Sequence, residues 1–153
     1  MIDAAIDAPV MIDAAPDAAI DAPPPMWTIV DTLTVSCLQQ ATTSTYVLLA
    51  GVTYRLRSTG TCVSNISNGS QGDAEYTFNP SVINDSSGGV DTGIAIDDAT
   101  TGPTKNPRWG AFTTTHIYEV PWVGSGTTIV ARVHADNYSN NAGTLTLRIL
   151  NLQ

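Results

Sequence analysis

Residues 144–149 read Thr-Leu-Thr-Leu-Arg-Ile, and residues 52–57 read Val-Thr-Tyr-Arg-Leu-Arg. In both stretches apolar and polar side chains alternate, which is the pattern of a β-strand with one buried face. The apolar residues of each stretch would face the core, and the Thr and Arg residues would face solvent. These two stretches predict that the chain builds its core between β-sheets.

The rest of the body repeats this signal in short runs, and no long segment has the 3.6-residue period of a helix. Breaks rich in Gly, Asn and Pro separate the runs. The further runs with β character are residues 32–35, 46–49, 92–96, 117–122 and 127–134. We therefore predict an all-β domain over residues 27–153, an antiparallel β-sandwich resembling a jelly roll.

The dipeptide Ala50-Gly51 lies between two of the predicted strands. A short Gly-containing break between two β runs is typical of a tight hairpin. We expect it to pair residues 45–50 with residues 52–57.

Residues 1–26 have a different composition. They repeat Asp, Ala and Pro and contain five Asp but no Lys or Arg. Proline removes backbone donors, and Asp residues spaced by four would repel on a helix face. We predict a disordered tail with polyproline II character, either a tether that holds the domain away from a cell surface or a linker within a longer protein.

The net charge is -8, of which the tail carries -5 and the other nine acidic and six basic residues leave -3. A body without a basic excess argues against nucleic acid as a partner and against docking on an anionic membrane. No apolar run approaches the ~20 residues that a membrane helix needs, so we expect no membrane insertion. Charged residues make up 13% of the chain, a low fraction that is common in secreted β proteins. No signal peptide is visible, although we expect a secreted or cell-surface location.

The two cysteines, Cys37 and Cys62, follow the first and third predicted strands. Antiparallel pairing could bring these points side by side, and a disulfide there would suit an oxidising compartment. Two buried free thiols are the alternative. With no other cysteine in the chain, a Cys-based zinc site is excluded.

The break before the last strand is rich in oxygen-bearing side chains. Asp136, Asn140 and Asn141 lie within six residues, with Tyr138 between them. Such oxygen ligands suit Ca²⁺, which takes 6–8 of them in irregular geometry. The alternative is that Asp and Asn are there for turn conformations.

These residues also carry a resemblance. An Asp, a short loop with Tyr, an Asn-Asn pair, a small residue, Gly and an alternating last strand resemble the calcium-dependent galactose-binding lectins of bacteria, the LecA (PA-IL-like) family. The resemblance implies that Asp136, Asn140 and Asn141 are calcium ligands and that sugar hydroxyls complete the coordination. It covers about a quarter of the chain, and the loop between the Asp and the Asn pair is shorter than in that family. Other stretches, such as residues 72–76, 91–98 and 109–118, resemble a broad group of secreted bacterial β domains with no assigned activity.

Other residues are candidates for sugar or metal contacts. Gln71-Gly72-Asp73 resembles a Gln-Gly-Asp near the sugar in those lectins, which would place Tyr76 and Asn79 where the family contacts sugar; galactose specificity is not implied. Tyr138 lies in the resembling loop, and Trp109 is the tryptophan that we expect to be exposed and able to stack on a sugar. Asp73 and Glu75 lie two apart in an expected strand, hence on one face, and could add carboxylates to a calcium site or be exposed edge charges.

The residues favour binding over catalysis. The chain has two histidines, His116 and His134, and no Gly-x-Ser-x-Gly nucleophile elbow. We predict that the protein is not an enzyme but a calcium-dependent carbohydrate-binding module, with an extracellular or cell-surface glycan as its partner. The alternative is a structural surface or filament subunit with a calcium-stabilised sandwich, which would be a homo-oligomer.

Overall fold

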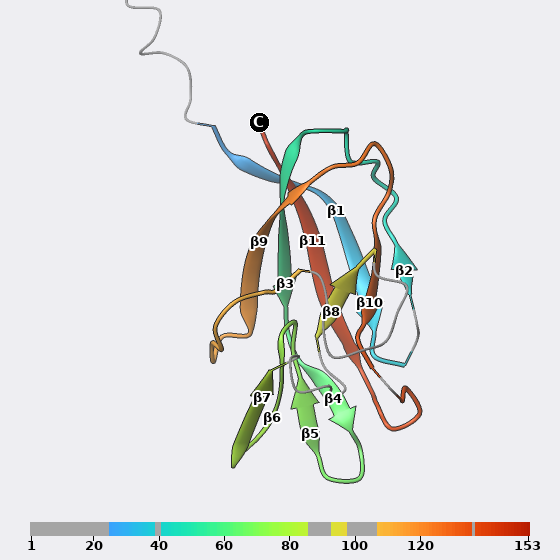
Figure 1. The fold of residues 1–153 in the computed structure, drawn as a ribbon, viewed down its shortest axis with the longest axis vertical. Helices are drawn as coiled ribbons and strands as arrows, with labels where there is room; N and C mark the ends of the chain where they lie inside the picture. The colour runs from blue at the N-terminus through green and yellow to red at the C-terminus, as the bar shows by residue number, and fades with distance from the viewer. Residues whose placement is uncertain (1–24, 39–40, 86–92, 98–106, 136) are drawn as a thin grey trace, which may run out of the picture.

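The computed structural model describes residues 25–38, 41–85, 93–97, 107–135 and 137–153. All regular secondary structure in these residues is β-strand, and every strand pairing is antiparallel (Figure 1). The predicted all-β antiparallel sandwich is confirmed. The described residues hold no helix that could cross a membrane. Residues 1–24 of the predicted tail lie outside the described residues.

The larger layer, sheet A, has the strand order β1-β11-β3-β9. Its strands are β1 (Trp27–Ser36), β11 (Thr144–Leu152), β3 (Thr53–Thr59) and β9 (Ile117–Val123). Leu147 of β11 lies opposite Leu33 of β1, so the first and last strands pair directly. The alternating pattern of residues 144–149 is reproduced, because Leu145, Leu147 and Ile149 are buried there.

The second layer, sheet B, has the order β2-β10-β8. It consists of β2 (Thr42–Thr43), β10 (Val130–Val133) and β8 (Ile94–Ile96). The core lies between the two layers and contains aliphatic side chains from both. From sheet A and sheet B it includes Leu33, Val35, Leu56, Val120, Leu147, Ile149, Ile94, Ile96, Ala131 and Val133. The sandwich therefore follows from the period-2 pattern of its strands.

A third sheet, sheet C, forms one end of the molecule (Figure 1). It is a meander of β4 (Cys62–Asn65), β5 (Ser70–Gly72), β6 (Tyr76–Asn79) and β7 (Val82–Asp85). We did not predict these strands from the sequence. They have three or four residues each, which is too short for alternation to identify a strand.

The predicted disulfide is confirmed. Cys37 and Cys62 are bonded, both side chains are buried, and the bond joins the end of β1 to the start of β4. It therefore ties sheet A to sheet C. A buried disulfide is typical of a protein from an oxidising compartment.

The predicted hairpin at Ala50-Gly51 is wrong. Residues 46–49 form no strand, and β3 pairs with β11 and β9. Gly51 does occupy a turn, with a φ of 76°. The Leu48 N–H donates to the Thr127 carbonyl and Leu48 accepts from Gly126, so this segment contacts the β9–β10 connection.

Candidate functional site

The connection between β10 and β11 holds the Asn pair, and its backbone is fixed against β4. Val63 and Ala142 exchange two backbone hydrogen bonds, at 2.8 and 2.9 Å. The Ile66 N–H donates to the Asn140 carbonyl at 2.7 Å. The Tyr138 hydroxyl donates to the Val133 carbonyl at 2.8 Å. The loop is therefore anchored at several points, which fixes where the two Asn residues lie.

Asn141 is buried without hydrogen-bond partners for its side chain. The residue is 1% exposed, and neither its Oδ1 nor its Nδ2 has a hydrogen-bond partner. Its neighbour Asn140 also has a buried Oδ1 without a partner. An unsatisfied buried polar group costs about 1–3 kcal/mol, and native proteins satisfy nearly all of them with protein, water or an ion. The buried amide oxygens of Asn140 and Asn141 therefore have no protein partner, and a bound water, ion or ligand could satisfy them.

Ser64 adds a hydroxyl on the segment that pairs with the loop. Val63 and Ala142 form an isolated antiparallel bridge, and Ser64 and Asn141 are the next residues on the two segments. The Ser64 Oγ is buried and has no hydrogen-bond partner. Two adjoining segments therefore contribute uncharged oxygen atoms that lack partners, the type of ligand that Ca²⁺ accepts.

Asp136 lies outside the described residues, so its predicted role as a ligand stays a prediction. Within the part of the chain that the structure describes, no group of three or more His, Cys, Asp or Glu side chains could hold a metal.

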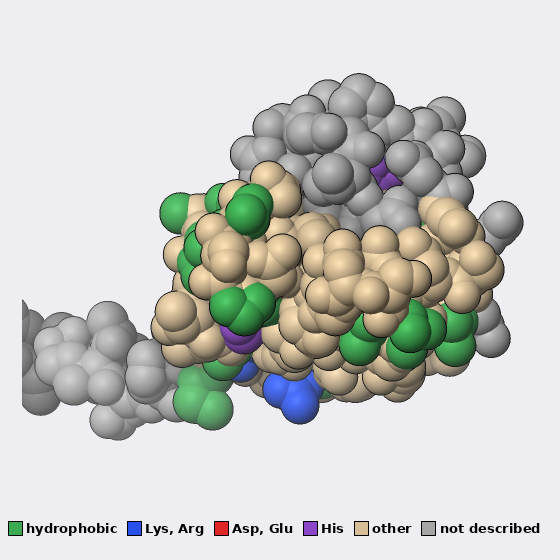
Figure 2. All heavy atoms as spheres, turned by 90° about the horizontal axis from the view of Figure 1, so that it is seen from below, with side chains coloured by type: hydrophobic (Ala, Val, Ile, Leu, Met, Phe, Trp, Pro, Cys, Tyr) green, Lys and Arg blue, Asp and Glu red, His purple; other side chains and the backbone are tan. Residues whose placement is uncertain are grey.

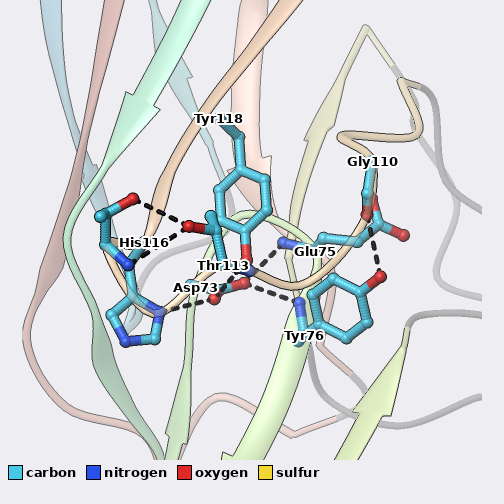
Figure 3. Close-up of polar contacts among 8 residues, drawn as sticks. Asp73, Glu75, Tyr76, Gly110, Thr113, His116 and Tyr118 are labelled. Carbon is cyan, nitrogen blue, oxygen red and sulfur yellow. Dashed lines mark hydrogen bonds and ion pairs between the residues drawn. The ribbon is translucent and has the colours of Figure 1, made fainter.

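Asp73 lies elsewhere than predicted, in the turn between β5 and β6, and is completely buried (Figure 3). Its Oδ1 accepts the N–H groups of Glu75 and Tyr76, at 2.9 and 2.7 Å. Its Oδ2 accepts the Tyr118 hydroxyl at 2.9 Å and lies 2.9 Å from His116 Nδ1. Burial, followed by the bond to Asp73, raises the pKa of Tyr118 above its ordinary value. These four contacts use both carboxylate oxygens of Asp73.

Glu75 lies in the same turn and has a different set of partners. Its Oε2 accepts the backbone N–H of Trp109 at 2.6 Å, and its Oε1 lies 3.1 Å from Arg108 Nε. The expected strand containing Asp73 and Glu75 is wrong, and neither carboxylate is an exposed edge charge. Together they hold the segment that leads into β9 against sheet C. We leave both out of the candidate site because protein groups already occupy their oxygens.

The expected sugar contacts are not gathered with the Asn pair. Tyr76 donates its hydroxyl to the Gly110 carbonyl at 2.9 Å (Figure 3), and Asn79 caps the β6–β7 turn by accepting the N–H groups of Ser81 and Val82. Trp109 is 4% exposed, so the expectation that it is exposed is wrong. Its indole N–H donates to the Ile94 carbonyl at 2.8 Å, which fixes it inside the core. Tyr138 does lie in the same loop as the Asn pair and is half-buried.

An aromatic cluster surrounds His116 and was not predicted from the sequence. The His116 ring stacks on Phe78 with 4.8 Å between ring centroids, and Phe112 makes edge contacts with Tyr76, Phe78 and His116. No local pattern indicates this cluster, because its members come from β6 and from the segment before β9. The cluster packs sheet C against that segment, and His116 is one of its packed rings.

Comparison with protein-family models, curated proteins and solved structures gives no match.

Proposed function

We propose that this protein is a secreted or cell-surface carbohydrate-binding module that depends on Ca²⁺, and that the β10–β11 connection is its metal site. Asn140 and Asn141 contribute side-chain oxygens, and Asp136 contributes the carboxylate. The observation that carries the proposal is the fully buried Asn141 side chain without a hydrogen-bond partner.

The position of this loop supports the proposal. Backbone hydrogen bonds hold the loop in place, so the Asn side chains are not needed for its local structure and can bind a ligand. A cation would remove the cost of the unsatisfied amide oxygens, which no group of the described protein does.

The chemistry supports a sugar as the ligand. Bound Ca²⁺ would supply coordination positions beyond those filled by the protein, and vicinal sugar hydroxyls are hard oxygen ligands of the kind it accepts. An ion held by the β10–β11 connection would lie beside β4 of sheet C. The buried disulfide supports an oxidising, extracellular location for such a module.

The test is a calcium titration by calorimetry together with thermal unfolding in calcium and in chelator. We expect the unaltered chain to bind Ca²⁺ and to gain about 2.7 kcal/mol of stability at a concentration 100 times the Kd. Asn141→Leu should abolish both effects. In chelator this variant should be as stable as the unaltered chain or more stable, because it replaces an unsatisfied amide by an apolar group of similar shape.

Two further variants complete the design. Asp136→Ala should lose calcium binding. Asn68→Ala is the matched control, because Asn68 caps the β4–β5 turn by accepting the Ser70 N–H and should leave calcium binding unchanged. Equal calcium binding by Asn141→Leu and the unaltered chain would contradict the metal site. A glycan array probed in calcium and in chelator then tests the sugar, and equal or absent signals in both conditions would contradict the lectin activity.

A further inference from the structure

The outer face of sheet A carries a row of charged side chains from three strands. Alternate residues of its strands point away from the core. Arg148 of β11 lies opposite Arg57 of β3, and Arg57 lies opposite Glu119 of β9. Arg55 follows on the same face of β3. The row therefore crosses three neighbouring strands.

This row has an excess of positive charge. Glu119 forms ion pairs with both Arg55, at 3.0 Å, and Arg57. Arg148 has no ion-pair partner among the described residues. Three guanidinium groups and one carboxylate leave two positive charges on one face of a chain whose net charge is -8. In the view of Figure 2, Lys or Arg side chains protrude at the lower side of the domain.

A groove adjoins the row and has an aromatic wall. It has a volume of about 400 Å³ and is lined by side chains that include Trp27, Arg55, Glu119 and Pro121. The Arg55 guanidinium lies 4.4 Å from the centre of the Trp27 ring. This volume is within the range of small-ligand sites, and the lining combines an indole with charged hydrogen-bonding groups.

We propose that this face binds a carboxylated polysaccharide, with one acidic sugar unit in the groove and further units along the row of arginines. The planar guanidinium fork matches a carboxylate bidentately, and an indole wall suits the apolar face of a sugar ring. The extended row across β3 and β11 suits a polymer.

This site is independent of the proposed calcium site. The groove lies where β1 begins, and Figure 1 shows the start of β1 and the β10–β11 connection at opposite ends of the sandwich. Binding here needs no metal, so it can be measured in chelator. Failure of one proposal therefore leaves the other to be tested.

The experiment measures binding of the full chain to immobilised polygalacturonate in EDTA, with uncharged dextran as the neutral reference. We expect polygalacturonate to bind, dextran not to bind, and the affinity to fall as salt rises. Arg148→Gln should weaken binding about fivefold, since it removes one charge-assisted contact. Glu119→Gln should strengthen it, because it removes the competing carboxylate from the row.

Opposite changes in these two variants are the result that supports the proposal, with unchanged thermal unfolding showing that both variants are folded. Unchanged affinity in both variants, or no binding to polygalacturonate in EDTA, overturns it. Equal affinity for dextran sulfate or for single-stranded DNA also overturns it, because the face would then attract any polyanion.

Discussion

At the scale of single residues, the buried polar groups of this protein fall into two kinds. Asp73 is completely buried and has four contacts to its two carboxylate oxygens. Asn141 is equally buried and has no side-chain hydrogen bond. The first residue holds the fold together at the junction of sheet C and β9. The second costs stability unless a ligand satisfies it, which is why it carries the functional proposal.

Tyr118 allows a test of the Asp73 network. Tyr118→Phe removes one donor to a buried carboxylate, and we expect it to lower the free energy of unfolding by about 1–3 kcal/mol. The raised pKa of Tyr118 means that the folded state keeps its proton at a pH where the unfolded chain releases it. The stability that it contributes is therefore present below about pH 10 and is lost as the pH rises above that value.

The measurement is urea unfolding of both proteins between pH 7 and pH 11, with an absorbance titration of the tyrosines. The titration of the unaltered chain should include a late contribution from Tyr118, whose pKa is raised, and Tyr118→Phe should lack it. Identical titration curves per tyrosine in the two proteins would contradict the assigned network.

The sequence permits some of these roles to be predicted and not others. The Asn140-Asn141 pair could be singled out because its oxygen-rich neighbourhood and its resemblance to a lectin loop are local. Asp73 was singled out for the wrong reason, since its partners His116 and Tyr118 lie more than forty residues further along the chain. The burial of Trp109 could not be predicted, because it depends on hydrogen bonds to the Ile94 carbonyl and the Glu75 carboxylate, which lie elsewhere in the sequence.

At the scale of elements, long alternating strands were predictable and irregular segments were not. Residues 144–149 lie in β11 and residues 53–57 lie in β3, because regular alternation with bulky apolar residues gives a strand one buried face. Residues 46–49 are all apolar and have β character, but Val47 and Leu49 are exposed and this segment joins no strand. Its conformation is set by a residue of β1 that lies well before it in the chain.

That residue is Asp31. Its Oδ2 accepts the N–H groups of Thr45 and Tyr46 at 2.8 and 3.0 Å and the Thr45 hydroxyl at 3.1 Å. Its Oδ1 accepts the Thr32 N–H. Partial burial acts to raise the pKa of Asp31, but the backbone hydrogen bonds from Tyr46, Thr45 and Thr32 outweigh it and lower the pKa below 3.8.

We therefore expect Asp31 to stabilise the fold above about pH 4 and to lose this effect as the pH falls below that value. The folded-state pKa lies below the unfolded one, so the folded state excludes the proton. Asp31→Ala should lower the free energy of unfolding at pH 7 by about 1–3 kcal/mol, and the difference between the two proteins should shrink between pH 4 and pH 2. Urea unfolding across this range measures it. A difference that is constant with pH would contradict the assignment.

At the scale of the whole molecule, the disulfide adds a covalent link between sheet A and sheet C. Cys37 directly follows β1 of sheet A and Cys62 begins sheet C, with a sequence separation of 25. Sheet C otherwise contacts the rest through the Val63–Ala142 bridge, the carboxylates of Asp73 and Glu75, and the aromatic cluster around His116.

Replacing both cysteines by alanine should lower the free energy of unfolding by about 3 kcal/mol in the chain-entropy model. Guanidinium unfolding of this variant and of the unaltered chain measures the loss. Asn141→Leu in the disulfide-bonded chain serves as a comparison, since it should not destabilise the protein in chelator. Equal midpoints for the cysteine variant and the unaltered chain would contradict a stabilising role for the bond.

The pairing of β1 with β11 also sets how the molecule resists a pulling force. Trp27 lies opposite Leu152 and Ser36 lies opposite Thr144, so the two strands run in opposite directions along the long axis. A force applied at Trp27 and at the β10–β11 connection shears β1 along β11, so the hydrogen bonds between the two strands must break together. A force applied at Trp27 and at Leu152 breaks these hydrogen bonds one after another. If a ligand binds at the β10–β11 connection while the chain is held at Trp27, a pulling force would load the β1–β11 pair in shear, the direction in which it resists more force.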